Sequence, residues 1–336
     1  MLLLTVLSGC RAAYVARVSC EHLRFIARAE PIVEEVSHTS DPARREKLET
    51  VLAVREFAAA NGLDPGGSYA EVSETEGLAR AHVVTAAYKD RLEPYVWRYP
   101  VVGSMPYRGY FERADADAYA AKLDGEGLDT HVVEASGYST LGWFNDPLPS
   151  GVLELDVVGV AGFVLHELTH RRLFVSGAID FNETLASAVS ARLTEKFFAE
   201  KGDDALLKRA LRRHAAWLDE AHACEVLSER LEAYFAENAG RSEVADSADL
   251  MAGRAAIYAT AVPRLRAVRL LPPEGDEADI NNAVLLAWRR YRSRVRDFEA
   301  YFDRYPSVDA ALAALETKLG ETEDPWVALG SAVAQP

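Results

Sequence analysis

Residues 153–201 read LELDVVGVAGFVLHELTHRRLFVSGAIDFNETLASAVSARLTEKFFAEK, and this stretch predicts two consecutive helices. Apolar residues recur at helical spacing through 153–174 and again through 182–201. Gly177 follows the first run and Gly202 follows the second, as expected where helices end. Because the turn between them is short, we expect the second helix to fold back against the first.

Two histidines lie four residues apart in the first predicted helix, at His166 and His170. Side chains at this spacing lie on one helix face, so both imidazoles can reach the same ion, and neutral imidazole is a common zinc ligand. Glu167 is turned by about 100° around the helix axis, which favours contact with a water on the metal rather than with the metal itself. The pattern predicts a zinc site with Glu167 as general base. Surface histidines beside a solvated glutamate are the alternative interpretation.

A catalytic zinc site usually has three protein ligands and one open position. Glu183 stands near the start of the second predicted helix, and folding that helix back would bring its carboxylate near both histidines. The alternative third ligands are Asp180, His214 and His222, of which the two histidines lie on a long charged helix predicted over 205–237. Glu183 is the preferred ligand.

Other residues are candidates for supporting roles. Asn182 either orients a metal ligand or caps the second helix at its N-terminus. A tetrahedral oxyanion needs a hydrogen-bond donor, for which Tyr291, Tyr258 and His222 are candidates. A core or surface role is the alternative for each of the three.

The length of 336 residues is sufficient for a large core in one or two domains. The formal net charge of −15 argues against nucleic acid as a partner, because phosphate binding needs a basic surface. It argues equally against electrostatic docking on anionic lipid.

The rest of the chain changes character near residue 150. Residues 81–87, 95–102 and 130–135 are rich in β-branched and aromatic residues, as strands are, and 112–123 is a short helical run between them. Further helices are predicted within 11–60 and over 205–237, 247–271, 281–305 and 308–319. The fold class is therefore α+β and predominantly helical. We expect N-terminal helices and an α/β subdomain in 10–150 and a helical metallopeptidase part with the metal motif in 151–336. The two parts are expected to form one compact catalytic unit.

The N-terminal residues 1–9 are apolar and uncharged, and they are too short to span a bilayer. Together with Cys10 they resemble a secretory signal ending in a bacterial lipobox, although no Lys or Arg precedes the apolar run. A chance LSGC sequence is the alternative. A true lipobox implies lipidation of Cys10 and a membrane anchor outside the cytoplasm. The two remaining cysteines, Cys20 and Cys224, are interpreted as buried free thiols, and a disulfide between them in an oxidising compartment is the alternative.

The metal motif, followed by Asn182-Glu183-x-x-Ala186, resembles the glutamate-zincin pattern, in which the glutamate is the third zinc ligand. More specifically, the chain resembles a family of aminopeptidases predicted in bacteria, many of them predicted lipoproteins. Besides the metal motif, the matching segments are Leu7-Ser8-Gly9-Cys10, Arg55-x-Phe57-Ala58, Pro100-Val101-x-Gly103, Tyr107-x-Gly109-Tyr110-Phe111, Tyr138-Ser139-Thr140-Leu141-Gly142-Trp143-Phe144-x-Asp146-Pro147 and Asn281-Asn282-Ala283.

The resemblance implies a zincin-like helical half and a Zn²⁺-dependent aminopeptidase with peptide substrates, held in the bacterial cell envelope by a lipid anchor. One alternative is a zinc endopeptidase that acts on envelope proteins or peptidoglycan peptides. Another is a non-catalytic zinc-binding envelope lipoprotein. Glu167 argues against the latter, because a structural zinc site closes with a fourth ligand and needs no base.

Overall fold

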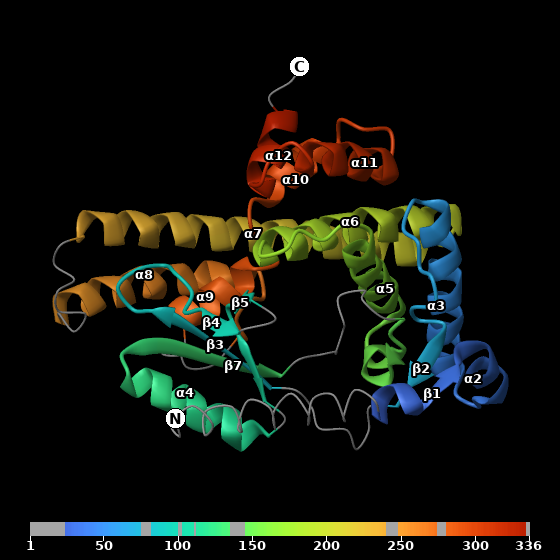
Figure 1. Cartoon of the computed structure of the whole chain (residues 1–336), viewed down its shortest axis with the longest axis horizontal. Helices are drawn as coiled ribbons and strands as arrows, with labels where there is room; N and C mark the ends of the chain where they lie inside the picture. The colour runs from blue at the N-terminus through green and yellow to red at the C-terminus, as the bar shows by residue number, and fades with distance from the viewer. Residues whose placement is uncertain are drawn as a thin grey trace, which may run out of the picture.

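The computed structural model describes residues 24–74, 82–99, 103–110, 112–134, 145–239, 248–273 and 280–333. Most of these residues are helical and the strands are short, which confirms the predicted α+β class (Figure 1). Cys10, Cys20 and the run 138–144 lie outside the described residues. Within the described part of the chain, no helix combines the length and the apolar character needed to cross a membrane.

The helical elements before the metal motif are α2 (Ile32–His38), α3 (Pro42–Ala60), α4 (Arg113–Gly125) and the 3₁₀ turn η1 (Ser150–Glu154). The motif helix and its successors are α5 (Val157–Arg172), α6 (Ile179–Glu200), α7 (Asp204–Glu237) and α8 (Ala248–Ala267). The remaining helices are α9 (Asn282–Arg289), α10 (Val295–Phe302), α11 (Val308–Leu319) and α12 (Pro325–Val333).

The predicted β-containing subdomain is an antiparallel sheet covered by one helix. Its strands lie in the order β6 (Arg108–Tyr110), β3 (His82–Tyr88) and β7 (Leu128–Glu134), and α4 packs on it. A separate hairpin pairs β4 (Trp97–Tyr99) with β5 (Gly103–Met105). Val84, Trp97 and Leu123 belong to the small core that this unit encloses.

A second sheet lies among the helices that carry the metal motif. Its strands are β1 (Ala29–Pro31), β2 (Glu71–Ser73) and β8 (Leu148–Pro149), in that order. One continuous core joins α3, α5, α6 and α10–α12, and its members include Val54, Leu168, Leu185, Phe298 and Leu329. The early helices therefore pack directly on the helices that carry the motif; the division of the chain at residue 150 stays a prediction.

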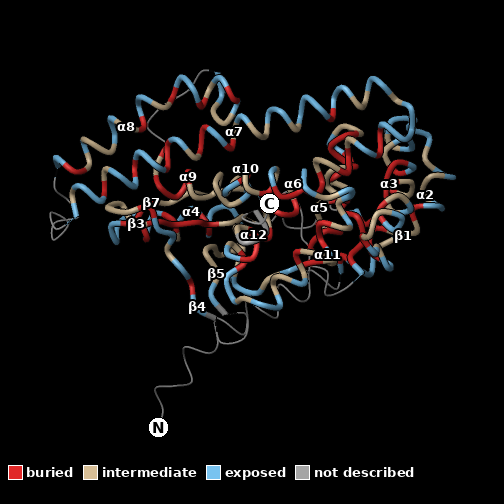
Figure 2. The backbone as a smooth tube through the Cα atoms, turned by 90° about the horizontal axis from the view of Figure 1, so that it is seen from above, coloured by how far each residue is buried: buried red, intermediate tan, exposed pale blue. Residues whose placement is uncertain are grey.

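The main core surrounds α5 and α6, whereas α7 and α8 expose their outer faces (Figure 2). Leu165 and Leu168 of α5 are fully buried, as are Leu185 and Val189 of α6. Because both helices are fixed along their apolar faces, the side chains that project between them have little freedom to move. This packing provides a rigid base for the metal motif.

A buried polar network attaches the α/β subdomain to the helical part. Asn282 is completely buried, and its side chain donates to the carbonyl of Tyr88 at 2.7 Å and accepts from the hydroxyl of Tyr258 at 2.6 Å. Its backbone N–H donates to Asp129 at 2.9 Å, and Arg254 donates to the same carboxylate at 2.6 Å. The Asn281-Asn282-Ala283 segment therefore has a structural role, because it joins the start of α9 to β3 and β7.

Replacing this asparagine should be costly. Asn282→Ala leaves the Tyr88 carbonyl and the Tyr258 hydroxyl without their buried partner, and we expect the free energy of unfolding to fall by about 2–4 kcal/mol. Urea unfolding followed by circular dichroism measures the change. Asn238→Ala, at the C-terminus of α7, removes a single hydrogen bond to the carbonyl of Tyr234 from a half-buried side chain; it is the matched control and should cost less than about 1.5 kcal/mol. Equal losses in the two variants would contradict the structural role.

Several predicted helix limits differ from the structure; α6 begins three residues before the predicted start at 182, and α8 ends four residues before the predicted end at 271. The helix predicted over 281–305 is interrupted between α9 and α10, where Arg294 has a left-handed φ of 51°. The helix predicted over 153–174 begins only at Val157, because Asp156 caps it by accepting from the N–H of Gly159. Neither break has a glycine or proline signal in the sequence.

Candidate metal centre and active site

Three side chains converge between α5 and α6. The Nε2 atoms of His166 and His170 are 3.2 Å apart, and Oε2 of Glu183 lies 3.2 Å from the first and 3.6 Å from the second. Among the described residues, these three form the one group of His, Cys, Asp or Glu side chains close enough to hold a metal ion. The structure therefore brings together the three residues that the spacing singled out.

The connection between the two helices is held by Asn182. Its buried side chain accepts from the backbone N–H of Val175 at 2.9 Å and donates to the carbonyl of Val175 at 2.8 Å. Gly177 supplies a positive φ of 80° within this short turn. Asn182 is thus neither the helix cap nor a partner of the imidazoles; α6 begins earlier, with Ala178 at the cap position and no side-chain cap.

The residue after the glutamate fixes a distant segment. The Thr184 hydroxyl donates to the carbonyl of Arg290 at 3.3 Å and accepts from the N–H of Ser293 at 3.1 Å. Trp217 of α7 donates to the carbonyl of Tyr291 at 3.1 Å. These contacts place the Tyr291 ring with its centroid 6.2 Å from that of His166. Sequence reasoning identified neither Thr184 nor Trp217, because their partners are about a hundred and about seventy residues away in the chain.

The charges of the three side chains are coupled. Burial by itself lowers the pKa of His166, but the hydrogen bond with Glu183 and the negative charge of Glu167 outweigh it and raise that pKa. Burial by itself raises the pKa of Glu183. The hydrogen bonds with His166 and His170 outweigh burial and lower this pKa to about 2. Glu183 is therefore an anion near neutral pH, the form in which a carboxylate binds a metal ion.

The donor atoms fit one tetrahedral ion. Zinc bonds of about 2.0–2.2 Å in tetrahedral geometry imply donor–donor separations of about 3.3–3.6 Å. The separations of 3.2, 3.2 and 3.6 Å among the three donor atoms agree with one face of such a tetrahedron. Among the described residues no fourth His, Cys, Asp or Glu joins this group, and the His166 and Glu183 side chains are each 17% exposed to solvent. Two nitrogens and one oxygen are a donor set that suits zinc.

The structure places the alternative third ligands elsewhere. Asp180 lies about one turn before Glu183 on α6 and is not in the metal-capable group. His222 is an exposed residue of α7 and contacts Glu225 and Arg296. Tyr258 belongs to the Asn282 network. Of the three proposed oxyanion donors, only Tyr291 therefore adjoins one of the three candidate ligands, His166.

His214 belongs to a separate charged cluster. Its Nδ1 lies 2.8 Å from Glu195 and its Nε2 lies 3.5 Å from Glu299, which also pairs with Arg192 at 2.6 Å. Burial by itself lowers the pKa of His214, but the contacts with Glu195 and Glu299 raise it to about 9. His214 is therefore a cation near neutral pH, which makes it a poor metal ligand.

This cluster predicts a pH dependence of stability. Because the pKa of His214 is about 9 in the folded chain and about 6.5 in the unfolded chain, its contribution is complete below pH 6.5 and is lost as the pH rises through 9. Allowing for solvent screening, we expect about 1–2 kcal/mol. Urea unfolding at pH 6 and pH 9.5 should show His214→Gln to be destabilising at the lower pH and nearly neutral at the higher. A loss of the same size at both values would exclude the ion pair as its cause.

A comparison with protein families finds one match that covers most of the chain. The family described as "Putative aminopeptidase" matches residues 13–322. The chain belongs to this family. The comparison with curated proteins finds no match, and neither does the comparison with solved structures.

Membership in the putative aminopeptidase family supports a peptidase with peptide substrates. The hydrogen bonds of the structure give a role to two segments that lie away from the metal ligands. Arg55 donates to the carbonyls of Ser68 and Gly66 and so fixes the 65–69 turn. Tyr69 in that turn donates its N–H to the carbonyl of Asp146 at 2.9 Å. In this family member, these segments position backbone around the helices that carry the metal motif.

Proposed function

We propose that this chain is a zinc-dependent aminopeptidase in which His166, His170 and Glu183 hold the metal and Glu167 is the general base. The observation that carries the proposal is the triangle of donor atoms, whose edges of 3.2, 3.2 and 3.6 Å match a tetrahedral zinc face. Family membership supplies the aminopeptidase class. A glutamate next to the first of two metal-ligating histidines on one helix is the arrangement in which metalloproteases use the glutamate as general base.

The remaining groups have separate roles in this proposal. Bound zinc would supply a Lewis acid that polarises the scissile carbonyl and makes water more acidic. The Glu167 carboxylate accepts a proton from the attacking water and returns it to the leaving amine nitrogen. The Tyr291 hydroxyl donates a hydrogen bond to the oxyanion that develops on the former carbonyl oxygen. Asn182 and Thr184 hold the segments that carry Glu183 and Tyr291.

The surroundings of His166, His170 and Glu183 suit an extended peptide. Phe174 is 40% exposed and its ring centroid lies 6.1 Å from that of His170, while Tyr291 is 39% exposed beside His166. Large aromatic side chains are costly to leave in water. Their exposure next to the metal ligands is consistent with contact to a substrate.

The wild-type protein provides the first test. Purified protein should contain one zinc per chain and should cleave leucine 4-nitroanilide, whereas removal of zinc by a chelator should abolish turnover and added zinc should restore it. Cleavage of N-acetylated peptides at internal bonds, with no action on free N-termini, would support the endopeptidase instead. Zinc binding without cleavage of either substrate would support the non-catalytic lipoprotein.

We also propose that the protein is lipid-anchored through Cys10 in the bacterial cell envelope. The support is the LSGC sequence after an uncharged apolar run. A clickable palmitate analogue supplied to an expressing bacterium should label the wild-type protein and leave Cys10→Ser unlabelled. Labelling of both proteins would exclude Cys10 as the anchor.

A further inference from the structure

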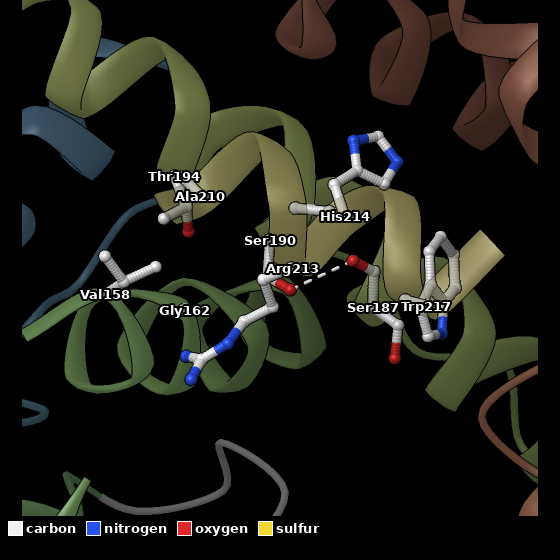
Figure 3. Close-up of a pocket in the computed structure, with 10 residues that line it drawn as sticks. Val158, Gly162, Ser187, Ser190, Thr194, Ala210, Arg213, His214 and Trp217 are labelled. Atoms are coloured by element: carbon white, nitrogen blue, oxygen red, sulfur yellow. Dashed lines mark hydrogen bonds between the residues drawn. The ribbon is translucent and has the colours of Figure 1, made fainter. Parts of the chain in front are cut away.

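A cavity lies where α5, α6 and α7 meet (Figure 3). Its volume is about 200 Å³. The space exists because each helix places small side chains at the meeting point, namely Gly162, Ser187, Ser190, Ala191 and Ala210. These short side chains leave a hollow that is partly open to solvent, so a group from outside the chain can enter it.

The cavity begins one helical turn from the metal ligands. Gly162 precedes His166 by four residues on α5, and Ser187 follows Glu183 by four residues on α6. The Ser187 hydroxyl donates to the carbonyl of Glu183 at 2.8 Å. Because one turn of helix rises about 5.4 Å, a group in the cavity is within the reach of one side chain from a peptide at the metal.

Trp217 contacts both the cavity and the segment that carries Tyr291. Trp217 lines the cavity, and its indole N–H donates to the backbone of Tyr291, whose ring lies beside His166. At the rim, Arg213 crosses from α7 to Asp156 at the start of α5, with a separation of 3.1 Å. Trp217 therefore belongs both to the cavity wall and to the contacts that hold the Tyr291 segment, and Arg213 lines the cavity while paired with Asp156.

A buried hydroxyl faces the space. Thr194 is 4% exposed, and its oxygen has no hydrogen-bond partner within the described part of the chain. A methyl group added at Gly162 would lie 3.7 Å from this oxygen, which places the hydroxyl opposite the cavity floor. Buried hydroxyls are nearly always paired, so the unpartnered oxygen indicates that a ligand or water occupies this space.

We propose that this cavity is the subsite for an uncharged, medium-sized side chain, such as leucine or methionine, that flanks the cleaved peptide bond. The inference rests on the proposed peptidase function. A cavity of about 150 Å³ is sufficient for a benzene-sized molecule, so about 200 Å³ accommodates a side chain of this size. Among the described lining residues there is no Asp or Glu to pair with a basic side chain, and the two cationic lining residues already have partners, Arg213 in Asp156 and His214 in Glu195 and Glu299.

Partial filling of the cavity tests this proposal. In Gly162→Ala the new methyl makes only ordinary contact with Thr194, and alanine is the better helix former, so the variant should fold. Ala191→Leu fills the space further. Both should be assayed on two dipeptide series, X-Ala and Ala-X, with X as glycine, alanine, leucine or methionine. We expect the ratio of kcat/KM for leucine to that for glycine to fall about 10- to 100-fold in one series only, which identifies the flanking residue.

Peptide binding provides a readout that does not depend on turnover. Calorimetry of the same dipeptides with zinc-loaded Glu167→Gln, with and without Gly162→Ala, should show a weaker affinity for the leucine peptide of the affected series. Ala215→Leu, on the exposed face of α7, controls for added apolar volume, and zinc content and thermal melts of every variant control for folding.

The outcomes separate the two proposals. If the wild-type protein cleaves dipeptides and the filled variants change all substrates in parallel, the cavity is not a subsite and the peptidase proposal stands. If wild-type protein cleaves no dipeptide but Glu167→Gln binds the leucine peptide in a way that Gly162→Ala weakens, the subsite stands and the peptidase proposal fails. If the protein neither binds nor cleaves any dipeptide, both proposals are wrong.

Discussion

Glu167→Gln should lower kcat by about 10²- to 10⁴-fold while the protein keeps its full zinc content. Glutamine has nearly the same shape as glutamate but accepts no proton near neutral pH, so the variant removes only the proton transfer. Glu167 is half-buried on α5 next to His166, and its charge reaches both His166 and Tyr291. A base in this position should act on water at the metal, and its loss should leave KM nearly unchanged.

The measurements are steady-state kinetics on leucine 4-nitroanilide and zinc analysis of the same preparation. Glu154→Gln, in the 3₁₀ turn before α5 and exposed, is the matched control and should retain wild-type kcat. Retention of more than about a tenth of the wild-type kcat in Glu167→Gln would exclude Glu167 as the general base. Loss of zinc together with activity would instead indicate that Glu167 is a metal ligand.

Glu183→Ala should weaken zinc binding by more than about 100-fold. Loss of a group that only contacts a metal ligand typically costs 10- to 100-fold in affinity, and we expect the loss of a ligand itself to cost more. The prediction depends on the separations of 3.2 and 3.6 Å that join the Glu183 carboxylate to the two imidazoles. Two histidines four residues apart on one helix would remain, and they form an incomplete site. Competition with a zinc-binding dye at pH 7 measures the affinity.

Two other variants identify the third ligand by comparison. Asp180→Asn and His222→Gln alter the rival candidates, one about a turn away on the same helix and one exposed on α7. Both should keep zinc affinity within about threefold of wild type, because neither residue belongs to the group of side chains that is able to hold the metal. Loss of zinc in either variant, with zinc retained in Glu183→Ala, would transfer the ligand assignment to that residue.

The segment from Phe181 to Thr184 shows how one helical turn organises the site. Consecutive helical residues are turned by about 100°, so the four side chains point to four different surroundings. Phe181 is buried in the core against Phe298, and Asn182 holds the turn before α6. Glu183 meets the imidazoles, and Thr184 holds the segment that carries Tyr291. The glutamate is therefore positioned by both of its neighbours.

Local periodicity was sufficient for several predictions. The helices α7 and α11 begin and end within one residue of their predicted limits, because long amphipathic runs and their end residues are local signals. The interruption between α9 and α10 was not predictable in this way. It depends on Thr184, on another helix, which bonds to Arg290 and Ser293 and favours a break at that point.

The sequence by itself determined that His166 and His170 share one helix face, that Glu167 adjoins them and that Glu183 follows a short turn, since all of these depend on spacing within a few helical turns. Only the tertiary structure decided that Tyr291 and Trp217 border the site, that Asn282 joins the two parts of the molecule and that a cavity opens beside the ligands. These features depend on contacts between residues far apart in the chain. Such contacts form only when the helices pack, and no local pattern encodes them.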